Sequence, residues 1–139
     1  MRENLRVRDI MSGEVTTLNQ NEQLTIADDI MRLGRIRHLP VVDDDERIVG
    51  IVSQRDLFRS ALARAIGYGE VAQNRVMGLL KVKEVMTIDV ATIGPDASLA
   101  EAADIMLRRK LGCLVVAEEN RIVGILTEGD FVELMACAG

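Results

Sequence analysis

The chain has 139 residues, of which 48% are hydrophobic and only 2% aromatic, and its formal net charge is −5. A length of this order suits one domain with a sizeable core, and that core must be aliphatic because the chain contains no Trp. The negative charge and the scarcity of aromatic side chains argue against a nucleic-acid-binding surface, which needs a basic face and stacking platforms.

The two cysteines and the hydropathy pattern predict the cellular compartment of the protein. Cys113 and Cys137 are too few for a disulfide framework and have no metal-binding spacing, so we expect a reducing compartment. No apolar run approaches the ~20 residues of a membrane-spanning helix. Residues 1–4 lead into no signal-peptide core. We therefore expect a soluble, cytoplasmic protein that uses no membrane.

The chain contains an internal repeat. The segment VRDIM at residues 7–11 returns as VKEVM at 82–86, and RIVGI at 47–51 returns as RIVGI at 121–125. Such self-similarity indicates one supersecondary unit that is copied and packed against its copy. Each copy alone would be marginal in size, so we expect a shared core with a cleft between the copies. The predicted boundaries are 5–60 for the first repeat, 61–80 for a helical connection and 81–137 for the second repeat.

Within each copy the predicted order is strand, helix, strand, strand, helix. β-prone stretches at 15–18 and 90–93 come first, and hairpins are predicted at 39–52 and 114–126, the first turning through the acidic run 43–46. The helix between them has one apolar face in each copy. That face comprises Leu24, Ala27, Ile30 and Met31, and then Leu99, Ala102, Ala103 and Met106. Ser98 and Glu101 predict a capping box, whereas Gln23 occupies the cap position of the first copy.

A Gly-x-x-Ser/Thr-x-x-Asp motif closes both hairpins. Its hydroxyl and carboxylate are Ser53 and Asp56 in the first copy and Thr127 and Asp130 in the second. One interpretation is purely structural, because Ser/Thr-x-x-Asp caps a helix start. The other is functional: the helix N-terminus favours a phosphate, and the carboxylate can bind a ribose diol. The two interpretations are compatible, and together they suggest a nucleotide-sized ligand.

The only histidine lies in the segment RHLPV, residues 37–41. We find no nucleophile, base or metal partner for His38 at a recognisable spacing, so the sequence predicts no enzyme and no metal site. Arg37 and His38 could instead meet phosphate oxygens. In the second copy the equivalent residues are Gly112 and Cys113, and the basic pair is absent.

These motifs, in this order and duplicated, resemble tandem cystathionine-β-synthase (CBS) domains over residues 5–60 and 80–137. The resemblance implies an α/β fold of two β-α-β-β-α repeats packed with pseudo-twofold symmetry, often associated as a homodimer. It also implies regulation by an adenosine-containing ligand (AMP, ADP, ATP or S-adenosylmethionine) in the cleft, with no required cofactor and an unknown effector protein. The alternative hypothesis is a ligand-free protein-interaction or dimerisation module.

The resemblance also assigns residues to two sites, each taking strand residues from one copy and the hydroxyl and aspartate from the other. The first ligand site comprises Val15, Thr16, Thr17, Arg37, His38, Leu39, Pro40, Ile125, Thr127 and Asp130. The second, weaker site comprises Val90, Thr92, Cys113, Leu114, Ser53 and Asp56. The first matches the family pattern better, because the second has no Arg-His pair. An energy-sensing role would follow from an adenine nucleotide as the ligand.

Overall fold

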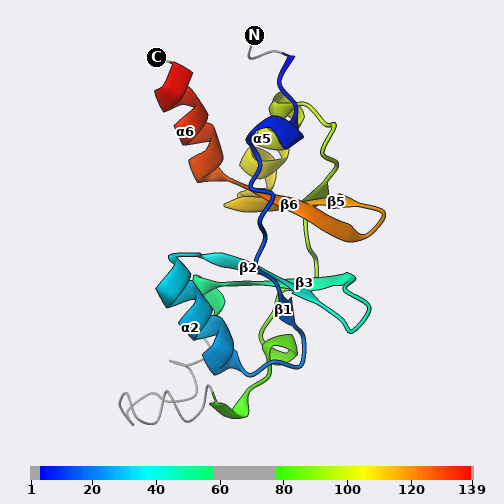
Figure 1. Ribbon diagram of the computed structural model, residues 1–139, viewed down its shortest axis with the longest axis vertical. Helices are drawn as coiled ribbons and strands as arrows, with labels where there is room; N and C mark the ends of the chain where they lie inside the picture. The colour runs from blue at the N-terminus through cyan, green and yellow to red at the C-terminus, as the bar shows by residue number, and fades with distance from the viewer. Residues whose placement is uncertain (1–3, 58–77, 139) are drawn as a thin grey trace. The chain divides into compact units, whose positions relative to one another are not determined.

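The computed structural model describes residues 4–57 and 78–138 (Figure 1). The chain forms two compact units. Unit 1 combines Met1–Val15 with Val90–Gly139, and unit 2 is Thr16–Asp89. The predicted helical connection, 61–80, lies mostly outside the described residues. The repeat boundaries stay a prediction about the sequence, since the compact units divide the chain at other positions.

Unit 2 contains a three-stranded sheet of order β1-β2-β3. Strand β1 (Leu18–Asn19) pairs parallel with β2 (His38–Val42), which pairs antiparallel with β3 (Ile48–Ser53). Helix α2 (Leu24–Gly34) joins β1 to β2 and lies against one face of the sheet (Figure 1). The helix buries Leu24, Ala27 and Met31, as its apolar spacing predicts.

Unit 1 repeats this architecture. Strand β4 (Thr92–Ile93) pairs parallel with β5 (Cys113–Glu118), and β5 pairs antiparallel with β6 (Arg121–Thr127). Helix α5 (Leu99–Arg109) joins β4 to β5, and α6 (Glu128–Ala138) follows β6. The mixed α/β fold with two like copies is thus confirmed. The Ser98 hydroxyl accepts a hydrogen bond from the Glu101 amide at 3.1 Å, which confirms the predicted cap, whereas Gln23 makes no such bond.

The first strand of each copy is shorter than predicted. Residues 15–17 carry no regular structure, and β1 begins only at Leu18. Likewise, β4 begins at Thr92 rather than at Val90. Parallel pairing explains the difference: only Leu18 and Asn19, or Thr92 and Ile93, have partners on the neighbouring strand.

Each unit also contains a short segment from the other sequence copy. We name residues 5–12 the first arm and residues 80–87 the second arm. The first arm forms helix α1 (Val7–Ile10) and belongs to the unit that holds the second copy's sheet. The second arm forms the 3₁₀ turn η2 (Val82–Glu84) and belongs to the unit that holds the first copy's sheet. Val7 and Val82 are fully buried in two separate hydrophobic clusters, one in each unit, rather than in the single shared core expected from the sequence.

Candidate functional site

The turn that follows β3 carries Ser53 and Asp56. The Ser53 amide donates to Asp56 Oδ2 at 2.9 Å, and the Asp56 amide donates to Ser53 Oγ at 3.1 Å. This reciprocal pair is a capping box on the helical residues 54–57. The capping interpretation is therefore confirmed for the first copy, and both side chains remain half-buried rather than sealed in the core.

The equivalent turn after β6 uses its hydroxyl differently. The Thr127 amide donates to Asp130 Oδ2 at 2.8 Å, and the Thr127 hydroxyl donates to the same oxygen at 3.3 Å. Both bonds end on Oδ2, so Oδ1 takes part in neither. Asp130 lies in the first turn of α6, where the partial positive charge of the helix N-terminus stabilises a carboxylate. The turn thus presents a half-buried anionic acceptor.

The residue that begins each hairpin lies directly opposite the hydroxyl residue of its own copy. His38 pairs with Ser53 across β2 and β3, and Cys113 pairs with Thr127 across β5 and β6. Opposite residues of an antiparallel pair share one face of the sheet. The structure thus brings these pairs together within a copy. The predicted grouping of His38 with Asp130, and of Cys113 with Asp56, joins different units and stays a prediction.

The other predicted site residues differ in their exposure. Arg37, Thr16, Thr17 and Thr92 are exposed, whereas Val15, Val90 and Ile125 are half-buried. By contrast, the strand residues Leu39, Pro40 and Leu114 are buried, so their side chains contribute to the cores of their units. Backbone groups tie the hairpin to the turn in both copies. The Gln54 amide donates to the Arg37 carbonyl at 2.8 Å, and the Glu128 amide donates to the Gly112 carbonyl at 3.2 Å.

Burial sets the chemistry of Cys113. Loss of solvation raises the pKa of its thiol from 9.0 to about 11. The thiol is therefore protonated at neutral pH and behaves as a small apolar side chain beside Thr127. Among the described residues, no group of three or more His, Cys, Asp or Glu side chains could hold a metal ion. No helix in the described ranges has the length and hydropathy to span a membrane.

The arms contact the strands that lead into both turns. Ser12 and Ile125 exchange two backbone hydrogen bonds of 3.0 Å, and Thr87 and Ile51 exchange two of 2.9 Å. Ser12 and Thr87 were not among the site residues predicted from the sequence. The usable signal was the glycine of each motif, because a residue without a side chain leaves room for another segment to approach, and an arm occupies that room.

Known proteins resemble this chain in sequence and in fold. The sequence matches the family described as the CBS domain at residues 7–63 and 82–137. Hypoxic response protein 1 of Mycobacterium tuberculosis is 32% identical over 88% of this chain and 80% of its own length. By contrast, the chain spans only 42% and 40% of two Methanocaldococcus jannaschii relatives, the uncharacterized proteins MJ1225 and MJ1232.

Two solved structures have the same fold over nearly their whole length. One is a protein from Vibrio cholerae named for acetoin utilization (AcuB), with a TM-score of 0.81, 34% identity, and coverage of 96% of this chain and 92% of its own. The other is the CBS domain pair of protein MJ0100 in complex with 5′-methylthioadenosine and S-adenosyl-L-methionine. It has a TM-score of 0.77, 29% identity, and coverage of 97% and 98%.

Proposed function

Because this chain belongs to the CBS domain family and carries two copies of the domain, we propose that it is a regulatory module that binds an adenosine-containing ligand. The observation that carries the proposal is the Thr127–Asp130 turn, in which a half-buried carboxylate stands at a helix start and keeps one oxygen outside the local bonds. The similar CBS pair of MJ0100 binds two adenosine compounds, which supports the same ligand class here.

The chemistry of the turn suits a ribose. The two hydroxyl groups of a ribose diol are donors, and an ionised carboxylate is an acceptor with two oxygens. Asp130 uses Oδ2 for Thr127 and can offer Oδ1 to the sugar. Ile125 precedes Thr127 by two residues and therefore projects from the same face of β6. Its half-buried side chain provides apolar surface for a flat purine.

We propose the first predicted site as the stronger one. The proposal assigns to it the residues named from the sequence: Val15, Thr16, Thr17, Arg37, His38, Leu39, Pro40, Ile125, Thr127 and Asp130. It contains the Arg37–His38 pair, which could meet phosphate oxygens and which the second site does not have. A ligand would regulate by binding one arrangement of the protein more tightly than another, which shifts the population by that difference in affinity. The predicted homodimer, effector protein and cytoplasmic location remain predictions.

The proposal is tested by titration calorimetry of the full chain with AMP, ATP and S-adenosylmethionine. We expect binding of at least one of them, and a larger loss of affinity in Asp130→Asn than in Asp56→Asn. Asparagine keeps an oxygen that can cap the helix but removes the charge and one acceptor, so the loss reports on ligand rather than on folding. No heat with any of the three at millimolar concentration would refute the proposal.

The second candidate function is a ligand-free interaction or dimerisation module. It is favoured by one observation: both carboxylates already accept hydrogen bonds at a helix start. Under this hypothesis the Asp56→Ala and Asp130→Ala variants lose stability in urea unfolding, and neither variant changes any ligand response.

A further inference from the structure

The last strand of each sheet has no strand partner on its outer side, and an arm bonds to it there through one residue. Strand β6 lies at the end of the order β4-β5-β6, so the outward amide and carbonyl of Ile125 have no strand partner there. Ser12 satisfies both groups with its own amide and carbonyl at 3.0 Å. In unit 2, Thr87 does the same for Ile51 on β3 at 2.9 Å. Each bridge lies two residues before the Thr127 or Ser53 of the proposed sites.

A methionine fixes each arm against the strand beside its bridge. Gly124 is buried, and a methyl group added to it would collide with the sulfur of Met11 and come within 3.0 Å of the Ser12 carbonyl oxygen. A methyl group on Gly50 would lie 2.5 Å from the Met86 sulfur and 3.0 Å from the Thr87 carbonyl oxygen. The methionine side chains thus occupy the space that a side chain at either glycine would need.

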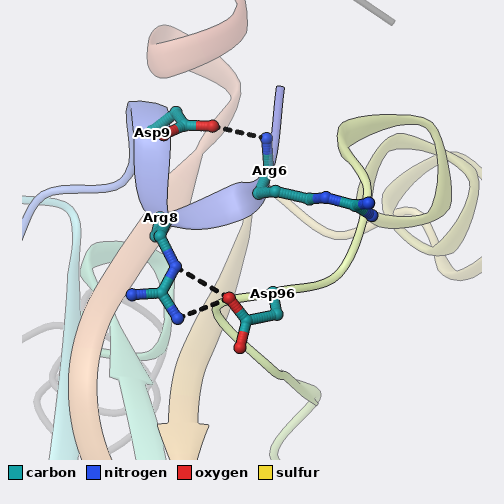
Figure 2. Close-up of polar contacts among 4 residues, drawn as sticks. All are labelled: Arg6, Arg8, Asp9 and Asp96. Atoms are coloured by element: carbon teal, nitrogen blue, oxygen red, sulfur yellow. Dashed lines mark hydrogen bonds and ion pairs between the residues drawn. The ribbon is translucent and has the colours of Figure 1, made fainter. Parts of the chain in front are cut away.

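The remainder of the first arm is anchored at the loop before α5. The amides of Val7 and Arg8 donate to the carbonyls of Ala97 and Pro95, both at 2.9 Å. The Arg8 guanidinium also forms an ion pair with Asp96 (Figure 2). The second arm repeats the two backbone contacts: the amides of Val82 and Lys83 donate to the carbonyls of Glu22 and Gln20 at 2.8 and 3.0 Å.

We propose that each arm is a positioning element for ligand binding in the opposite copy. Met11 and Ser12, at the start of the first copy, hold strand β6, which ends at Thr127 and leads into the turn with Asp130. Met86 and Thr87 hold the strand that carries Ser53. This inference rests on the proposed function and adds that docking of the arm controls the affinity for the ligand. If the ligand requires the docked arrangement of Ile125–Thr127, then undocking of the arm lowers the apparent affinity in proportion to the docked fraction lost.

The internal repeat supplies a matched control for this crossed arrangement. In the full chain, Met11→Ala is expected to weaken binding of whichever of AMP, ATP and S-adenosylmethionine the parent binds most tightly, measured in an Asp56→Asn background, which leaves the Thr127–Asp130 site intact. We expect a loss of roughly fivefold to tenfold, the lower part of the usual range for coupling between sites. Met86→Ala in the same background is expected to lose less affinity than Met11→Ala, because the Met86 arm bonds to Ile51 on β3, whereas the Met11 arm bonds to Ile125, two residues before Thr127. Met11→Leu, which conserves the side-chain volume, should bind like the parent.

Amide hydrogen exchange tests the positioning without ligand. Met11→Ala should speed exchange of the Ile125 amide and leave the Ile51 amide unchanged, and Met86→Ala should do the reverse. Equal losses of affinity in the two alanine variants, or an unchanged affinity in Met11→Ala, would overturn the inference. If the parent protein binds none of AMP, ATP and S-adenosylmethionine, the proposed function fails and the ligand-affinity part of the inference fails with it. The exchange pattern then decides separately whether each arm holds its strand.

Discussion

Replacement of Gly124 by alanine measures how strongly the first arm is held. The added methyl group needs space occupied by the Met11 side chain, and it lies 3.0 Å from the Ser12 carbonyl oxygen. The methionine is flexible and can leave, but the carbonyl is tied by its bond from the Ile125 amide. Overpacking of this kind costs about 1–3 kcal/mol. Because Met11 is only half-buried, its displacement forfeits the lower part of the ~1.5–3 kcal/mol for burying such a side chain.

Urea unfolding of the full chain gives the magnitude directly. A loss of ~2 kcal/mol with a slope of ~2 kcal/mol/M lowers the unfolding midpoint by ~1 M. Gly13→Ala is the control, because nothing lies within 4 Å of a methyl group at that glycine. The double variant Gly124→Ala, Met11→Ala should lose less than the sum of the single variants, since the alanine at 11 removes the colliding atoms. Strict additivity, or an unchanged midpoint in Gly124→Ala, would refute the packing argument.

Three further predictions concern single side chains. Burial favours the protonated Cys113 thiol and raises its pKa from 9.0 to about 11. The contribution of the buried thiol to the free energy of unfolding is therefore complete below pH 9 and is lost as the pH rises toward 11. In urea unfolding between pH 9 and pH 11, the free energy of unfolding of the wild type should fall by about 2–3 kcal/mol more than that of Cys113→Ala. If stability depends on pH in the same way in both proteins, this prediction is wrong. In thermal unfolding, Ser98→Ala should lower stability by ~1 kcal/mol and Gln23→Ser should raise it by a similar amount, because Ser98 accepts a capping bond and Gln23 does not. A destabilised Gln23→Ser variant would contradict the capping argument. Asp96→Asn should cost less than ~1 kcal/mol, with the difference vanishing near 1 M salt, because its ion pair with Arg8 is largely exposed.

The local elements could be predicted because their signals are local. Apolar spacing placed Leu99, Ala102 and Met106 on the buried face of α5, and β-branched runs on either side of an acidic turn predicted the hairpins. The first strands were predicted too early, at residues 15 and 90. A strand exists only where a neighbour pairs with it, and that partner lies more than twenty residues further along the chain.

In the candidate site, too, the local features could be predicted and the finer geometry could not. The motif identified both hydroxyl–aspartate pairs, and the capping bonds at Ser53 and Thr127 are those that short-range reasoning expects. The two turns share the motif, yet Ser53 accepts a bond from its aspartate's amide while the Thr127 hydroxyl donates to the carboxylate. A hydroxyl group can donate or accept, so the motif by itself leaves the direction of this bond open.

The duplication, the order of elements and the residues of the two turns follow from the amino-acid sequence, because each depends on neighbours along the chain or on direct self-similarity. The placement of each arm with the sheet of the opposite copy follows only from the folded chain. That assignment depends on contacts such as Met11 with Gly124, which lie more than a hundred residues apart. Both copies carry the same arm pattern and the same glycine, so periodicity cannot distinguish docking within a copy from docking across copies. In either arrangement an arm would satisfy backbone groups at the outer edge of a sheet, and the contacts of the folded chain place each arm on the sheet of the opposite copy.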